Sequence, residues 1–404
     1  MSKIKNITAR EIMDSRGNPT VEVELKTEKR SFFASVPSGA STGKNEALEL
    51  RDKDGKGVFD AILNVNKIIA PKLKNYNVTE QAKIDKFLIE FDGTENKSKL
   101  GANAILAVSM AVCRAGALAT KIPLYQHIAV LAGVLGPLKL PLAGFNILEG
   151  GVHANNGLDI QEFMIVPQKK TFAENLMTGN KVYQNLKKIL IKNYGDKAII
   201  MGDEGGFAPP ISSTQQALFL LKSASENQDV KIAIDCAASQ FYKNGKYLLE
   251  SKELTRSGLL YFYKEIINSF PIVFIEDPFA EEDWEGFREI TKEFSSKISI
   301  IGDDLTTTNI KRIKEAHNKS ACNGVILKLN QIGTVSETIE AAKLAKSFGW
   351  KTVVSHRSGE TLDDFIADLA VGVRADFIKS GSPTKEERMV KYNRLLQIES
   401  ELRK

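Results

Sequence analysis

KIAID, residues 231–235, is a short apolar run that ends on a carboxylate, and five later runs end in a similar way. The polar residues that follow those runs are Glu276, Asp303 with Asp304, Lys328, the group Ser355, His356, Arg357 and Ser358, and finally Lys379. Amphipathic helical stretches separate the runs, which is the alternation of a parallel sheet covered by helices. One Asp after a strand is usually a turn or a helix cap. Six polar strand ends in register instead predict a (β/α)8 barrel with its active site at that face.

The chain before the barrel has a different pattern. Residues 20–25 (TVEVEL) alternate apolar and polar side chains, and a second strand-like run, residues 32–36 (FFASV), follows after a turn. This pattern predicts a hairpin. From about 60 to 127, apolar residues return at helical spacing and predict several helices. The Gly/Pro/Leu passage at 132–141 (AGVLGPLKLP) interrupts this pattern and is the candidate domain boundary.

Length and composition limit the class of protein. A chain of 404 residues exceeds what one hydrophobic core usually supports, so we predict an N-terminal α+β domain over 1–135 and a barrel domain over 136–404. The 55 basic and 50 acidic residues are scattered, which argues against nucleic-acid binding. Three cysteines without a pair, no secretory segment and no apolar run long enough to span a bilayer predict a cytoplasmic protein without a membrane role.

The segment VPSGASTGK, residues 36–44, resembles a phosphate-binding loop in composition. A P-loop requires four residues between its first Gly and the Gly-Lys pair, whereas Gly39 and Gly43 are separated by three. The nucleotide interpretation therefore fails. The small, hydroxyl-rich composition favours a mobile lid over residues 37–44.

Three of the strand-end carboxylates, Asp235, Glu276 and Asp303, form an all-oxygen set. Such a set suits Mg²⁺, because hard divalent cations prefer oxygen ligands. The alternative is a buried salt-bridge network with Lys328 and Lys379, although burying so much charge for structure alone is seldom favourable. Zinc is disfavoured, since the four histidines include no HExxH motif and no cysteine pair is present.

The remaining polar residues indicate proton transfer beside a carboxylate. Nearby cations should lower the pKa of Lys328 and make it a base, while neighbouring carboxylates should keep Glu204 protonated as an acid. Arg357 and Ser358 could clamp a phosphate through the planar guanidinium fork. His356 lies beside them and favours a site role, and His153 is left open between a functional loop residue and a structural one.

At these residues the sequence closely resembles the enolase family, and the resemblance extends over almost the whole chain. The segments that carry it are AREIMDSRGNPTVEV, VPSGASTG, GANAILAVSMAVCRAGA, HANNGLDIQEFM, GDEGGFAP, IDCAAS, IEDPFAEEDWEGF, GDDLTTTN, LKLNQIGT, SHRSGET and IKSGSP. Members of the enolase superfamily use a Lys or His base with one or two Mg²⁺ ions to stabilise an ene-diolate.

The resemblance implies reversible dehydration of 2-phosphoglycerate to phosphoenolpyruvate, in glycolysis and gluconeogenesis. It implies Lys328 as base and Glu204 as acid, assisted by Glu162. It implies Asp235, Glu276 and Asp303 as ligands of a first Mg²⁺, with Lys379 at the substrate carboxylate, Arg357 and Ser358 at the phosphate, and His153 and Gln161 approaching the substrate from a loop. By the same resemblance, Ser41 on the lid delivers a second Mg²⁺ when substrate binds, and the lid is not a nucleotide cradle.

The family fold is a small α+β domain followed by an eight-stranded barrel whose first connections depart from simple alternation. Enolases are homodimers or octamers. The rival interpretations are a racemase or cycloisomerase that acts beside a carboxylate, and a binding or structural protein on the same scaffold. Plasminogen-type surface binding is left open as a second role beside catalysis. Three residues depart from the family pattern, namely Glu149, Gln240 and Ser380. We expect these departures to affect the loop dynamics and the reaction rate, and not the reaction itself.

Overall fold

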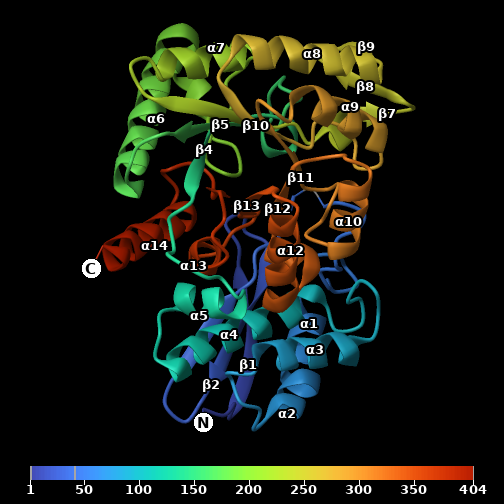
Figure 1. The fold of residues 1–404 in the computed structure, drawn as a ribbon, viewed down its shortest axis with the longest axis vertical. Coiled ribbons are helices and arrows are strands. Elements are labelled where there is room, and N and C mark those ends of the chain that lie inside the picture. The colour runs from blue at the N-terminus through green and yellow to red at the C-terminus, as the bar shows by residue number, and fades with distance from the viewer. Residues whose placement is uncertain (1, 41, 404) are drawn as a thin grey trace.

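The computed structural model describes residues 2–40 and 42–403, and its N-terminal part is an antiparallel sheet packed against helices (Figure 1). The strands are β1 (Asn6–Met13), β2 (Pro19–Lys26) and β3 (Ser31–Ser35), in that order across the sheet. The predicted hairpin is present as β2 and β3, with Val23 opposite Ala34. Val21, Val23 and Leu25 are fully buried on one face, as the alternating pattern requires.

The helices of this part cover the buried face of the sheet. They are α1 (Phe59–Leu63), the π-helical turn η1 (Asn64–Ile69), α2 (Ala70–Leu73), α3 (Gln81–Asp92), α4 (Ala102–Thr120) and α5 (Leu124–Leu131). By length and composition α4 could cross a membrane, but 83% of its most apolar window is buried inside the protein, as in a core helix. The predicted boundary passage, 132–141, lies between α5 and the first barrel strand.

The rest of the described chain forms a closed eight-stranded barrel. Its strands are β4 (Leu142–Glu149), β5 (Glu162–Pro167), β6 (Val230–Asp235), β10 (Ile272–Glu276), β11 (Ser299–Gly302), β12 (Gly324–Leu327), β13 (Lys351–Ser355) and β14 (Phe377–Lys379). The six predicted runs are therefore strands of this barrel. One strand breaks the parallel pattern, because β5 pairs antiparallel with both β4 and β6.

Helices surround the barrel (Figure 1), and its interior is filled by side chains. The helices are α6 (Phe172–Tyr194), α7 (Thr214–Ala224), α8 (Arg256–Ser269), α9 (Trp284–Phe294), α10 (Ile310–Asn318), α11 (Leu329–Ile332), α12 (Val335–Ser347), α13 (Phe365–Gly372) and α14 (Glu386–Leu402). Short turns η2 (Gly151–His153), η3 (Asp196–Ile199) and η4 (Ala238–Phe241), and a small sheet of β7 (Tyr242–Lys243), β8 (Lys246–Leu249) and β9 (Lys252–Leu254), complete the fold. The inward-facing residues form one apolar cluster: Met164, Val166, Ala233, Phe274, Ile301, Ile326, Val353 and Phe377. The barrel is therefore a packed core and not a pore.

Candidate active site

The N-terminal part contacts the barrel at the end where the site residues lie. Ser38 pairs with Gly359 through two backbone hydrogen bonds of 2.8 and 2.9 Å, and Ala40 N donates to Ser358 Oγ at 2.7 Å. The described residues of the predicted lid therefore lie against the predicted phosphate clamp. Ser41, the predicted ligand of a second metal ion, lies outside the described residues.

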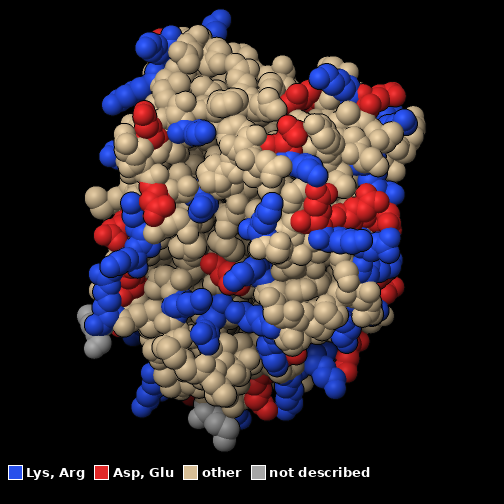
Figure 2. Space-filling view, turned by 45° about the horizontal axis from the view of Figure 1, so that its top comes forward, with Lys and Arg blue, Asp and Glu red and all other residues tan. Residues whose placement is uncertain are grey.

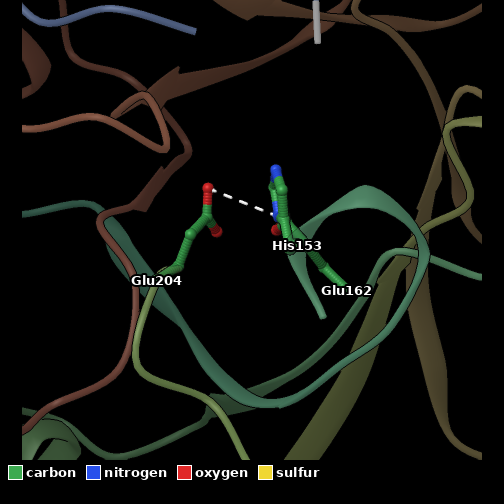
Figure 3. Close-up of side chains that lie close together, drawn as sticks. All are labelled: His153, Glu162 and Glu204. Atoms are coloured by element: carbon green, nitrogen blue, oxygen red, sulfur yellow. Dashed lines mark ion pairs between the residues drawn. The ribbon is translucent and has the colours of Figure 1, made fainter. Parts of the chain in front are cut away.

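Most of the predicted site residues line one polar cavity. They are His153, Gln161, Glu162, Glu204, Lys328, His356, Arg357, Ser358 and Lys379, and the cavity is also lined by Gly39 and Ala40 of the predicted lid and by Ser355, which directly precedes His356. They come from β5, β13, β14 and the loops after β4, β12 and η3. Figure 3 shows His153 facing Glu204, with Glu162 beside it.

Asp235, Glu276 and Asp303 are buried, and their ligand atoms lie within 4.8 Å of one another. Lys379 Nζ is 3.0 Å from Asp235 Oδ2 and 2.8 Å from Glu276, and it also donates to Glu162 at 3.3 Å. The ion pairs of the salt-bridge alternative are thus present.

These ion pairs do not balance the charge, because four buried carboxyl groups face only two ammonium groups. The carboxyl groups are those of Asp235, Glu276, Asp303 and Glu162, and the ammonium groups are those of Lys379 and Lys328. Burial raises the pKa of Glu276 well above its usual range, and the neighbouring Asp235 carboxylate raises it further. The all-oxygen donor set and its excess of negative charge fit a divalent cation.

A second acidic group adjoins the first and shares Asp303. It adds Asp277 and Asp304, which the sequence analysis did not assign to a metal site. Asp277 accepts hydrogen bonds from the backbone N–H groups of Asp303 (2.8 Å) and Asp304 (2.7 Å). Asp277 thereby fixes the loop that carries Asp303.

Lys328 follows β12 and forms an ion pair with Asp303. The expected fall in its pKa is wrong for this structure. Burial and the charges of Arg357 and Lys379 act to lower the pKa of Lys328, but the Asp303 carboxylate outweighs them and raises it. The salt-bridge alternative included this pair, but the sequence did not indicate that the Asp303 carboxylate outweighs burial and the two cations.

Glu204 is buried and held by three side chains. Asn146 Nδ2 donates to Glu204 Oε2 at 2.7 Å, His356 Nε2 is 3.2 Å from the same oxygen, and His153 Nδ1 is 3.7 Å from Oε1. Burial alone would raise the pKa of Glu204, but His356 and His153 lower it well below its usual range when they are protonated, although burial also lowers the pKa of each histidine. The expectation that Glu204 retains a proton by itself is therefore wrong.

Of the two carboxyl groups, Glu162 binds a proton more readily than Glu204. Burial raises the pKa of Glu162 well above its usual range, and the charge of Glu204 adds to the effect. Their carboxylate oxygens lie within 4.8 Å. Like-charged carboxyl groups this close separate their pKa values, so that one is ionised and the other protonated.

Arg357 is fixed by groups that no motif indicated. Its guanidinium donates to Glu46 at 2.9 Å and to Asn330 Oδ1 at 3.0 Å. Arg388 on α14 lies behind it, fully buried, and donates to Arg357 O at 2.7 Å and Ser358 O at 2.5 Å. Arg388 Nη1 also lies 2.7 Å from His356 Nδ1. The site therefore depends on a residue of the outer helical layer.

Arg388→Met is expected to lower the free energy of unfolding by about 1–3 kcal/mol or more, because buried acceptors lose their donor. The measurement is denaturant unfolding. Arg288→Met is the control, since Arg288 is 58% exposed in a surface ion pair, which contributes about 0–1 kcal/mol. Equal stability losses in the two variants would contradict this account of Arg388.

The three departures from the family pattern lie in different places. Gln240 is an exposed residue of η4, away from the cavity. Ser380 is fully buried directly after Lys379. Glu149, at the end of β4, is fully buried, and its carboxylate contacts the loop that carries Glu204 and not the side chain of His153.

A barrel with acidic, basic and amide side chains gathered around a polar cavity defines an enzyme whose substrate is a small molecule. Two family models match the chain: the N-terminal domain of enolase over residues 4–128 and the C-terminal TIM barrel domain of enolase over residues 137–404. An enolase of Methanocaldococcus jannaschii is 51% identical over 410 residues, which cover 99% of this chain and 96% of that relative. The chain belongs to the enolase family and is a hydro-lyase of the phosphopyruvate hydratase type.

Proposed function

We propose that this protein catalyses the reversible, Mg²⁺-dependent dehydration of 2-phosphoglycerate to phosphoenolpyruvate, in glycolysis and gluconeogenesis, with Lys328 as the base and Glu204 as the acid. The observation that carries the proposal is the shared cavity: Lys328, Glu204 and the proposed phosphate ligands Arg357 and Ser358 line the same polar space. A racemase or cycloisomerase has no need of a phosphate clamp.

On the base side, Lys328 removes the proton next to the substrate carboxylate. Lys328 must first be neutral, and its ion pair with Asp303 opposes this. Asp303 is also one of the three proposed metal ligands, so the same carboxylate pairs with Lys328 and would bind the metal ion. Lys379, buried among carboxylates, keeps its positive charge, because these neighbours raise its pKa despite burial. It offers that charge to the substrate carboxylate as negative charge develops there.

On the acid side, Glu204 and Glu162 act as a pair that contains one proton. The raised pKa of Glu162 favours Glu162 as the residue that carries this proton, and ligand oxygens of the two carboxyl groups lie within 4.8 Å of each other. Glu204, directed by Asn146 and His356, donates it to the departing hydroxyl group. His153 and Gln161 line the same side of the cavity and bind the substrate.

We assign Asp235, Glu276 and Asp303 to a first Mg²⁺ and expect a second Mg²⁺ to enter with substrate. When bound, Mg²⁺ would neutralise the carboxylates and polarise the substrate carboxylate, which acidifies the adjacent C–H bond. The chain's own contribution is to hold these three carboxylates buried and close together in advance.

A chelator is expected to abolish phosphoenolpyruvate formation, and excess Mg²⁺ to restore it. Mg²⁺ should also raise the melting temperature, since a ligand at 100 times its Kd stabilises the native state by about 2.7 kcal/mol. Asp303→Asn should remove both effects. The measurements are ultraviolet detection of phosphoenolpyruvate and thermal unfolding.

Glu315→Gln is the matched control, because the side chain of Glu315 is 44% exposed and its partner is the surface residue Lys319. It should keep both responses to Mg²⁺. Failure of folded, Mg²⁺-loaded wild type to form phosphoenolpyruvate would reject the proposed function. A response to Mg²⁺ in Asp303→Asn equal to that of wild type would reject the assignment of the ligands.

Figure 2 shows Lys and Arg side chains over one face of the molecule, with Asp and Glu side chains among them. We further propose that the protein is cytoplasmic and assembles as a homodimer or octamer. The domain limits 1–135 and 136–404 and a plasminogen-type surface role stay predictions.

A further inference from the structure

We propose that Glu149 is a positioning residue that fixes the backbone of the 202–206 loop and thereby directs the carboxyl group of Glu204 into the cavity. The inference rests on the proposed role of Glu204 as the acid. It assigns a function to a buried carboxyl group that lies outside the cavity lining.

The carboxyl group of Glu149 accepts two backbone hydrogen bonds from this loop. Glu149 Oε1 accepts from Gly206 N at 2.5 Å, and Oε2 accepts from Glu204 N at 3.1 Å. The two oxygens therefore hold the amide of the acid itself and the amide two residues later. Both would lack an acceptor if Glu149 were replaced by an apolar residue, since no other hydrogen bond from either amide is described.

The glycines of the loop fit closely around this carboxyl group. A Cβ at Gly206 would lie 2.8 Å from Glu149 Oε1, and a Cβ at Gly202 would clash with Glu149 Oε2. Gly205 has a φ of +90°, which other residues rarely adopt. The loop is thus shaped to bring its backbone against Glu149.

Other groups hold the remaining polar atoms of the loop. Ser382 N donates to Glu204 O at 2.9 Å, Tyr183 Oη donates to Gly205 O at 2.8 Å, and Lys385 Nζ donates to Gly202 O at 3.1 Å. Glu149 supplies the acceptors and these residues supply the donors. Removal of the Glu149 carboxyl group would therefore release one side of the loop while the other side stays fixed. We expect this to change the orientation of Glu204 without unfolding the loop.

The ionisation of Glu149 provides a second readout. Burial, together with the charge of Glu204, raises the pKa of Glu149 to about 8 from 4.5. The titratable and charged groups that act on it or adjoin it are Glu204 on the loop, Glu162 on β5, Tyr183 on α6 and Arg388 on α14. Between pH 4.5 and 8 an unfolded chain releases this proton while the folded chain keeps it, so stability falls as pH rises.

The test compares wild type with Glu149→Gln, whose amide has a single acceptor oxygen for two N–H groups. Three quantities are measured: deuterium exchange of the backbone amides of residues 204 and 206, the dehydration rate, and exchange of the substrate's carbon-bound proton with solvent. The last reports the base, Lys328, alone. Asp203→Asn is the control, because its side chain belongs to the same loop but faces Arg16 at 3.7 Å.

In Glu149→Gln we expect both amides to lose protection and dehydration to slow by about tenfold to hundredfold, the cost of a small displacement of a catalytic group. Exchange of the carbon-bound proton and KM should change by about twofold or less. The melting temperature of Glu149→Gln relative to wild type should rise as pH increases from 4.5 to 8. Asp203→Asn should behave as wild type in every measurement.

Unchanged dehydration and amide protection in Glu149→Gln would overturn the inference, and so would an equal slowing of dehydration and proton exchange, which indicates general damage. If wild type forms no phosphoenolpyruvate, the proposed function fails, and amide exchange alone then decides whether Glu149 fixes the loop. If Glu149→Gln does not fold, Glu149→Asp replaces it, because the shorter carboxylate cannot reach both amides.

Discussion

Lys328→Ala is expected to lower the rate of phosphoenolpyruvate formation by about 10²–10⁴-fold, the usual contribution of a positioned general base. Lys328 lines the cavity and is buried beside Asp303, whereas the other lysine of the cavity, Lys379, is held by Glu162, Asp235 and Glu276 and is not placed to replace it. KM should change far less than kcat, because the phosphate and carboxylate of the substrate contact other residues in the proposed mechanism.

The proton next to the substrate carboxylate gives a sharper measurement. In deuterated water, wild type should exchange this proton, and Lys328→Ala should not, even during long incubation with Mg²⁺. Lys311→Ala serves as the control, since Lys311 is 78% exposed. Retention of exchange in folded Lys328→Ala would show that another group is the base.

Glu204→Gln is expected to lower dehydration by about 10²–10⁴-fold while proton exchange continues. The amide can still accept the hydrogen bond of Asn146, so the side chain should stay in place. It cannot relay the proton of Glu162 to the departing hydroxyl group. The measurement is the ratio of proton exchange to phosphoenolpyruvate formation, which should rise steeply in this variant.

Glu226→Gln, an exposed substitution of the same type, should leave that ratio unchanged. Loss of proton exchange together with dehydration in Glu204→Gln would mean that Glu204 supports substrate binding or the base. Retention of normal dehydration would leave Glu162 as the direct acid.

The barrel and most of its site could be predicted because the end of each strand is marked in the sequence itself. An apolar run followed by a charged side chain is a local signal, and parallel packing brings these ends together. This placed Asp235, Glu276, Lys328 and Lys379 at one face. Glu162 carried no such signal, because it begins a strand that runs in the opposite direction, and only the resemblance indicated it.

The protonation states could not be predicted, since they depend on which groups face each other across the barrel. Lys328 meets Asp303, which raises its pKa, and Glu204 meets two histidines, which lower its pKa. Neither pair is adjacent in the sequence. The contact of Arg388 with the clamp was hidden for the same reason, because a buried arginine in a polar helix resembles a surface residue.

The reversed strand β5 also has an evolutionary consequence. Because β4 and β5 form a hairpin, the segment 150–162 begins and ends at the same face and carries His153, Gln161 and Glu162 together. Three residues on the acid side of the cavity are thus encoded in one contiguous stretch of thirteen codons, whereas Asp303, Lys328 and Lys379 belong to separate strand-helix units. Insertion, exchange or recombination within that stretch could therefore reshape the acid side of the cavity while the base side is inherited unchanged.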